Sequence, residues 1–156
     1  MSLYQEIFAT TKDVLLHNWP SEDVPNSLAE AGYTVTVYGG PEPDDIFSHE
    51  VRDGQSVVTR TGTPPEHADL VYVLPWPGFV RDTDLPPLVR QAQALGATTL
   101  WYQSAMAAEG VQDPRGCWLS GDDASHVREI VESAGLRLVA DAYIADAVRA
   151  ARPHDA

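Results

Sequence analysis

The chain has 156 residues, a hydrophobic fraction of 44%, and a formal net charge of −13 from 10 Lys and Arg against 23 Asp and Glu. This length suits one domain with a single core, and the negative charge argues against nucleic acid or an anionic membrane as a partner, because both require a positive surface. The single cysteine, Cys117, excludes an internal disulfide framework, and no apolar run is long enough to span a bilayer, so we expect a cytoplasmic protein.

Residues 1–12 are expected to form a short N-terminal helix or a tail. Leu3, Ile7 and Phe8 recur at helical spacing, which favours a helix. A frayed tail that covers the edge of a sheet is the alternative. Because no linker or internal repeat interrupts the sequence, the domain is expected to extend over residues 1–156.

Residues 13–41 have the pattern of strand, tight loop, helix and strand, the opening βαβ unit of a parallel sheet. Apolar and β-branched runs predict strands over 13–16 and 33–38. The helix between them is predicted over 21–31, and Gly32 suits its end.

The loop between the first strand and the first long helix matters most for function, because ligands of parallel sheets bind outside the carboxyl ends of the strands. It reads His17-Asn18-Trp19-Pro20, where a dinucleotide-binding protein would carry glycines. Ser21 is predicted to cap the following helix, with acidic residues after it at the positive end of the helix dipole.

The middle of the chain predicts a hairpin and a buried strand. Asp53-Gly54 separates two runs with strand character, and we expect a small β-hairpin that projects over the strand ends. Residues 69–74 form the most continuous apolar run and predict a central strand, which Pro75-Trp76-Pro77 ends.

The rest of the chain alternates between helices and strands. The predicted segments are a helix from 84 to 95, a strand over 98–102, a helix over 120–134 capped by Ser120, a strand over 136–140 and a helix over 142–151. The long connection before the capped helix is expected to contain a half-turn at 105–109. This alternation predicts an α/β fold: a doubly wound Rossmann-like domain with a mainly parallel sheet of about five strands.

Three helix–strand junctions share a pattern with one known family. GATTLWYQ at 96–103 looks like "GAK-x-VW-x-Q", AGLRLVAD at 134–141 looks like "AGL-x-VV-x-D", and AGYTV at 31–35 is similar to "GY-x-V". With these motifs in order, the chain resembles the small bacterial CoA-binding-domain proteins, whose Rossmann-like module also forms the front of succinyl-CoA synthetase α-chains. The resemblance implies this fold and CoA as the ligand.

The chain departs from the family pattern where the ligand would bind. The family's first loop is rich in glycine and serine, so that backbone amides can approach a pyrophosphate. Here the indole of Trp19 and the missing amide of Pro20 work against that approach. The family's "V-N-P" corresponds to residues 37–41, VYGGP, and its Phe-Arg element is replaced at 75–77, with Arg81 nearby.

The predicted strand ends gather aromatic and polar side chains at one rim, as a small-molecule pocket requires. We expect Trp19 and Trp76 either to line the pocket or to cover the core, and Trp101 to be in the core. The candidate cofactor-binding residues are Asn18, Trp19, Ser21, Tyr38, Gly39, Trp76, Arg81, Gln103 and Ser104.

Two of these residues have a structural alternative. The family resemblance suggests that Gln103 faces the ligand, whereas its alternative role is to tie down the adjacent loop. Arg81 is the best candidate to meet an anionic group, and an ion pair with Asp82 or Asp84 explains it equally well.

His17 is the one candidate catalytic residue, as an acid, a base or a hydrogen-bond partner; the alternative is an imidazole that satisfies the loop backbone. Motifs of serine hydrolases, P-loop enzymes and dinucleotide-binding dehydrogenases are missing. Whether the protein is an enzyme is therefore left open. No metal site is predicted, because the other histidines have no ligand spacing with one another or with the lone cysteine; they are His49, His67, His126 and His154.

The sequence leaves functions of different classes open. The first is a non-catalytic module that holds CoA, a related nucleotide or an acyl thioester, using the amides of Ser21 and Glu22, aromatic packing and Arg81. The second is a domain that has lost nucleotide binding and serves as a small enzyme or accessory protein for an aromatic or apolar metabolite, with His17 and Gln103 in the crevice. A structural subunit is the third, and a homodimer is compatible with each.

Overall fold

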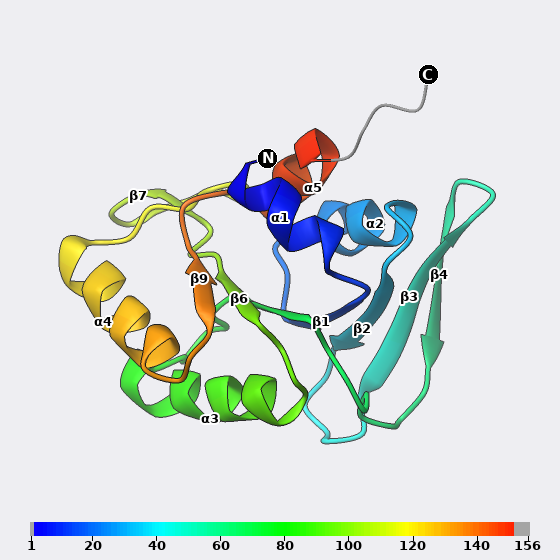
Figure 1. The fold of residues 1–156 in the computed structure, drawn as a ribbon, viewed down its shortest axis with the longest axis horizontal. Helices are drawn as coiled ribbons and strands as arrows, with labels where there is room; N and C mark the ends of the chain where they lie inside the picture. Colours follow the sequence, from blue (N-terminus) through cyan, green and yellow to red (C-terminus); the bar gives the residue numbers. More distant parts are fainter. Residues whose placement is uncertain (1, 152–156) are drawn as a thin grey trace.

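Seven strands form one sheet in the order β4-β3-β2-β1-β5-β6-β9, with helices on both faces (Figure 1). The computed structural model describes residues 2–151. Five neighbouring strands run parallel: β2 (Thr34–Tyr38), β1 (Asp13–His17), β5 (Leu70–Val73), β6 (Thr99–Tyr102) and β9 (Arg137–Val139). The predicted doubly wound α/β fold with a mainly parallel sheet is confirmed, and the sheet has seven strands instead of about five, because two antiparallel strands join its edge.

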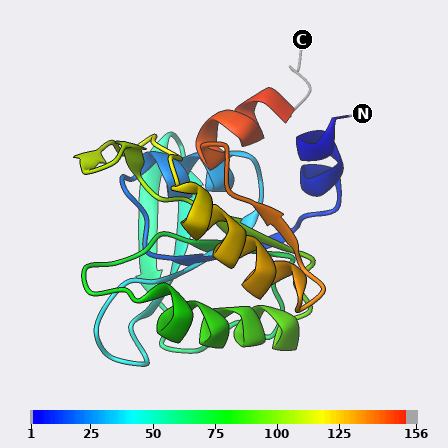
Figure 2. The same cartoon turned by 90° about the vertical axis from the view of Figure 1, so that its left-hand side faces the viewer.

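Helices cover both faces of this sheet, as Figures 1 and 2 show. One face carries α1 (Leu3–Ala9), α2 (Asp23–Glu30) and α5 (Ile144–Ala151), and the other carries α3 (Arg81–Ala94) and α4 (Gly121–Glu132). Each layer has its own apolar cluster, because successive residues of the central strands point to opposite faces. Leu16 and Tyr72 pack under the first layer, and Leu15 and Val71 under the second.

Trp101 lies in the core, as predicted. Its side chain is fully buried among the first helix layer, and its indole Nε1 donates a hydrogen bond to the Ala142 carbonyl at 2.9 Å. The N-terminal segment is a helix rather than a tail. Ser2 and Gln5 form a capping box, and Phe8 packs beside Trp101 with ring centroids 5.7 Å apart.

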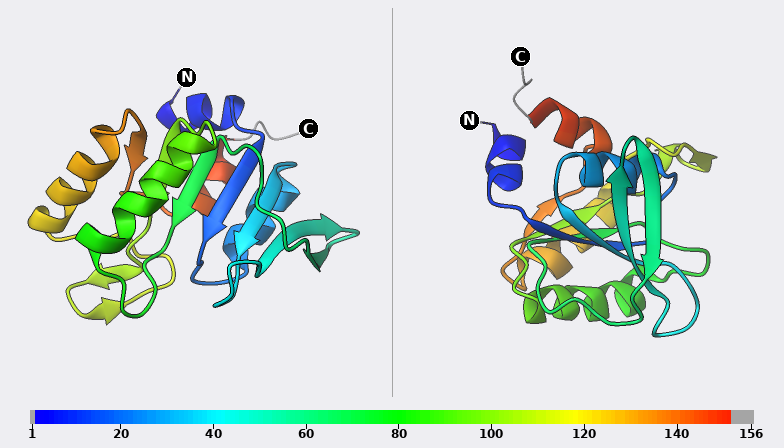
Figure 3. Two further views of the ribbon diagram at one scale, coloured as in Figure 1. Left: turned by 90° about the horizontal axis from the view of Figure 1, so that it is seen from below. Right: turned by 90° about the vertical axis from the view of Figure 1, so that its right-hand side faces the viewer.

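The predicted hairpin exists, but its expected position was wrong. Asp53 and Gly54 both have positive φ, as a tight hairpin turn requires, between β3 (Ile46–Arg52) and β4 (Gln55–Arg60). Instead of projecting over the strand ends, β3 pairs antiparallel with β2 and extends the main sheet (Figure 3).

The connection after β6 also differs from the prediction. The expected half-turn at 105–109 is a second hairpin, formed by β7 (Met106–Ala108) and β8 (Val111–Gln112). Ala105 turns the chain into it with φ of 57°, and its amide donates to the Gly116 carbonyl at 3.0 Å. This hairpin stands at the carboxyl end of the sheet (Figure 3, left).

One predicted helix cap is confirmed and one is wrong. The Ser120 hydroxyl accepts the Asp123 amide at 3.1 Å and caps α4. Ser21 does not cap α2. The helix begins two residues later with Glu22 at the N-cap position, because the Ser21 carbonyl accepts the Val24 amide in a preceding turn.

None of the helices within residues 2–151 has the length and apolarity that crossing a membrane requires.

Candidate functional site

The site lies at the carboxyl ends of β1 and β5, where the order in which strands are added to the sheet reverses. The chain leaves β1 for β2 on one side, and the later parallel strands add on the other. Ligands of doubly wound sheets bind in the crevice at this switch point. Here the loops after the two strands are joined: the Leu74 amide donates to the His17 carbonyl at 3.0 Å, and the Asn18 side chain donates to the Leu74 carbonyl at 3.3 Å.

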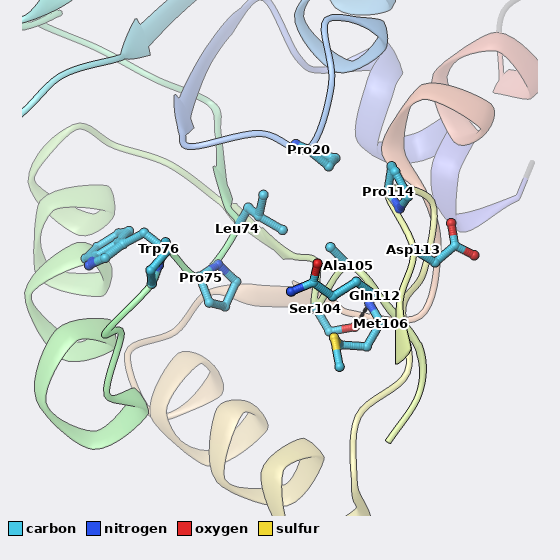
Figure 4. A pocket seen from close by; sticks show the side chains of 11 residues that line it. Pro20, Leu74, Pro75, Trp76, Ser104, Ala105, Met106, Gln112, Asp113 and Pro114 are labelled. Carbon is cyan, nitrogen blue, oxygen red and sulfur yellow. Dashed lines mark hydrogen bonds between the residues drawn. The ribbon is translucent and has the colours of Figure 1, made fainter. Parts of the chain in front are cut away.

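Two cavities open on either side of the loop after β1. The first, which we call the proline-lined cavity, has a volume of about 500 Å³ and lies between the loop after β5 and the connection after β6 (Figure 4). The second, the aromatic cavity, has a volume of about 660 Å³ and lies between the loops after β1 and β2. Trp76 lines both. Each volume is within the range of small-molecule sites.

The aromatic cavity collects most of the predicted binding residues. Its walls are His17, Asn18, Trp19, Tyr38, Gly39, Gly40, Pro41 and Trp76. Ser104 lines the other cavity. Asn18 has φ of 66°, a backbone conformation that favours glycine and that asparagine tolerates better than most residues.

His17 is held inside the protein by an aromatic ring and a glutamine. Its imidazole stacks on Tyr38 with centroids 4.8 Å apart, and its Nε2 lies 2.6 Å from Oε1 of Gln91. Gln91 also donates to the Tyr38 hydroxyl at 3.3 Å. Burial lowers the pKa of His17 to about 4, so the ring is neutral at pH 7. Its partner is on α3 rather than in the loop backbone, and this weakly basic ring suits a binding wall better than acid–base chemistry.

Acidification from pH 7 to pH 5 is expected to destabilise the protein through His17. The unfolded chain protonates this imidazole near its ordinary pKa of 6.5, whereas the folded protein does so only near 4, so stability falls as the pH drops through this window. The expected loss at pH 5 is about 2 kcal/mol. Urea unfolding at both pH values measures it, and His17→Phe is expected to remove this part of the loss.

His67 provides a control, because its protonation is expected to change the stability in the opposite direction. The hydrogen bond that the His67 imidazole donates to the Asp69 carboxylate raises the pKa of His67, so its protonation favours the folded state in acid. His67→Asn is therefore expected to steepen the loss of stability on acidification. A His17→Phe protein with the same pH response as wild type would contradict the assignment.

Gln103 is buried and lines neither cavity. Its Nε2 donates to the carbonyls of Pro114 and Gly116 at 2.8 and 3.2 Å, and its Oε1 accepts from the Tyr72 hydroxyl. Both polar atoms of its side chain therefore make hydrogen bonds to other groups of the protein. Of its two predicted roles, the structure places it in the second, which ties down the adjacent loop, and we leave it out of the ligand contacts.

Arg81 and Ser21 also line neither cavity. Arg81 begins α3, and its guanidinium donates to Asp82 at 2.9 Å and also binds Asp123 across to α4. These contacts raise its pKa, with Asp82 as the largest cause. The sequence allowed an ion pair of Arg81 with Asp82 or Asp84, and the pair with Asp82 is present. The contact with Asp123 was not predicted.

The start of α2, where a phosphate would be expected, holds a cluster of paired charges. The Asp23 carboxylate accepts from the Tyr143 hydroxyl at 2.8 Å and from Arg149, and the Arg149 hydrogen bond lowers the pKa of Asp23. Arg115 lies 4.7 Å above the Tyr143 ring and pairs with Asp146. Each of these two arginines therefore already has a carboxylate partner.

Sequence reasoning missed most of the proline-lined cavity. Its residues are Pro20, Leu74, Pro75, Trp76, Pro77, Ser104, Ala105, Met106, Gln112, Asp113 and Pro114. Residues 105–114 form the second hairpin and its return, where the sequence shows no alternation. The one glycine and the one proline of this stretch were the sequence features that could have indicated its turns.

Two other groups carry no function that we can assign. Burial raises the pKa of Cys117 to about 11, so its thiol stays protonated. Asp13, His67 and Asp69, at the opposite end of the sheet, bring their ligand atoms within 4.8 Å of one another. The Asp69 carboxylate already accepts two backbone amides and contacts His67, so we assign it a structural role. His154 lies outside the described residues.

Comparison with known proteins identifies the family. A family model described as a CoA binding domain matches residues 16–145, from the end of β1 to the start of α5, a span that includes both cavities. No curated protein and no solved structure matches the chain significantly. Because the family model covers most of the chain, the protein belongs to the CoA-binding domain family.

Proposed function

We propose that this protein is a non-catalytic module that holds CoA or an acyl thioester of CoA in the crevice made by the two cavities. One observation supports this proposal above the others: two cavities of ligand size share Trp76 at the switch point of a CoA-binding domain. Two adjoining cavities suit an elongated ligand that has a planar base at one end and a flexible thiol arm at the other.

The aromatic cavity is the proposed site of the adenine base. The flat rings of Trp19, Tyr38 and Trp76 line it, and stacking on such rings is the usual way to bind a base without reading its edges. Gly39 is part of this wall, and a Cβ there would make ordinary van der Waals contact with the rings of Phe47 and Trp19, at 3.4 Å.

The phosphates are proposed to pass the loop that separates the two cavities. Trp19 faces the aromatic cavity and Pro20 the proline-lined cavity, so a ligand that fills both must cross near the start of α2. The first amides of a helix have no intrahelical partner and can bind an anion. The proposed donors are the amides of Glu22, at the N-cap of α2, and of Ser21, just before it.

A second function is favoured by the paired charges at the rim. Arg81, Arg115 and Arg149 each bind an aspartate, and a phosphate would have to displace those carboxylates. A domain that has lost nucleotide binding and holds an uncharged aromatic or apolar metabolite instead would keep these ion pairs intact.

Titration with CoA distinguishes the two functions. Because Trp19 and Trp76 line the aromatic cavity, CoA is expected to change tryptophan fluorescence and, at one hundred times its Kd, to stabilise the fold by about 2.7 kcal/mol. NAD serves as a control with the same base and a different arm. If millimolar CoA changes neither fluorescence nor melting temperature while indole does, the second function holds.

A further inference from the structure

The proline-lined cavity has apolar walls and a neutral polar group inside. Figure 4 shows Trp76 at one end, Asp113 and Pro114 at the other, and the Gln112 side-chain amide pointing across the space between them. None of its eleven lining residues is Lys or Arg. An apolar chain would therefore lose water-exposed surface here, and an anionic group would find no cation.

The one ionisable side chain of this wall is an acid. Asp113 is fixed at the end of the cavity, because its Oδ1 accepts the Arg115 amide at 3.0 Å and its own amide donates to the Ala105 carbonyl at 2.9 Å. The Arg115 guanidinium turns instead to Asp146. The Asp113 carboxylate points away from the space in Figure 4, and no side chain of the lining offers a cation to an anionic ligand group.

The wall is also closely packed against the protein behind it. A Cβ on Gly116 would lie 2.4 Å from the Met106 backbone, so the two segments touch with no space between them. Gln103 holds the Pro114 and Gly116 carbonyls from inside the protein. These contacts brace the wall of the cavity from inside the protein.

We infer that the proline-lined cavity takes an uncharged acyl group and rejects an acyl group that ends in a carboxylate. This inference rests on the proposed function, with the base in the aromatic cavity and the thioester here. The Ser104 hydroxyl accepts the Met106 amide at 3.2 Å and keeps its own proton, so it can donate to a thioester carbonyl, as can the Gln112 amide. A terminal carboxylate would lose its hydration and find no cation in the lining.

Two acyl-CoA ligands with the same four carbons test this inference. Calorimetric titration is expected to show butanoyl-CoA binding at least tenfold more tightly than succinyl-CoA, which differs by its terminal carboxylate. Hexanoyl-CoA is expected to bind more tightly still, by about twofold to fourfold for each added methylene. Equal affinities for butanoyl-CoA and succinyl-CoA would overturn the inference.

A variant that supplies the missing cation sharpens the test. Gln112→Arg places a guanidinium where the neutral amide now points, and it is expected to raise the affinity for succinyl-CoA about tenfold relative to butanoyl-CoA. Gln93→Arg adds the same charge elsewhere, since Gln93 binds the Ala134 carbonyl near the start of β9. If both variants change the preference equally, or neither does, the cavity does not select the acyl group.

The inference can fail separately from the proposed function. If no CoA compound binds, the proposed function is wrong, and butanoyl-pantetheine and succinyl-pantetheine, which lack the nucleotide, then test the cavity alone. A preference for the butanoyl compound that Gln112→Arg reduces about tenfold would support the inference without CoA. Absence of that preference would overturn it.

Discussion

Replacing Trp76 by alanine is expected to weaken CoA binding at least thirtyfold and to change the free energy of unfolding by no more than about 1 kcal/mol. Trp76 is the residue that lines both cavities, so its loss removes contacts with both halves of the proposed ligand. Stacking of a base on an aromatic side chain contributes about 2 kcal/mol, which corresponds to this factor. The effect on folding is small because the side chain is 37% exposed and packs edge-on against Phe79.

Trp118 provides a matched control. Its side chain is 39% exposed, close to the value for Trp76, and it lines neither cavity. Trp118→Ala is expected to leave the affinity for CoA unchanged, and Trp76→Phe, which keeps a ring, to weaken it by less than fivefold. Calorimetric titration and urea unfolding of the three variants measure both quantities. Equal losses of affinity in the two alanine variants would show that Trp76 is not the shared wall of the site.

The architecture could be predicted from the sequence because local patterns determine it. Continuous apolar runs such as residues 70–73 identified buried strands, and the glycines at 32, 96 and 135, all with positive φ, marked the junctions where helices end. The alternation of these segments is enough to give a doubly wound sheet, and the position of its ligand crevice follows from the strand directions.

The places where prediction failed depend on contacts between residues far apart in the chain. Asp53-Gly54 specifies a hairpin but not its neighbour, which is β2 through pairs such as Val35 with His49. The second hairpin is fixed by the contact of Ala105 with Gly116, and neither residue has a strand signature. Local propensity carries no information about such pairings.

The same limit applies to the candidate site. Six of the residues that the sequence singled out, among them those of the loop after β1, line the aromatic cavity. It could not foresee their partners: His17 binds Gln91 on α3, and Arg81 binds Asp123 on the next helix. A residue's role as a ligand contact or as an internal brace is decided by such partners. Gln103 shows this most clearly.

Gln103→Met is expected to lower the free energy of unfolding by about 3 kcal/mol. Methionine has a similar volume, so the change removes the amide and leaves little empty space. It leaves the carbonyls of Pro114 and Gly116 without their donor and the Tyr72 hydroxyl without its acceptor, and the bonds to Gly116 and Tyr72 are buried. Each buried polar group left unpaired costs about 1–3 kcal/mol.

Gln112→Met is the control, because Gln112 belongs to the same connection and its side chain is exposed. It is expected to change stability by less than about 0.5 kcal/mol. Tyr72→Phe removes one bond of the network, and the double variant with Gln103→Met is expected to cost less than the sum of the single changes, because both act on the same hydrogen bond.

Hydrogen exchange and binding together separate the two roles that the sequence allowed for Gln103. If it braces the loop, Gln103→Met speeds exchange of the Ala105, Asp113 and Gly116 amides, which close this connection, and affinity falls only because the proline-lined cavity loosens. If it contacts the ligand, affinity falls while stability and exchange stay at their wild-type values. The buried position of Gln103 and its three internal hydrogen bonds favour the first outcome, in which a family motif residue acts on the ligand through the loop that it holds.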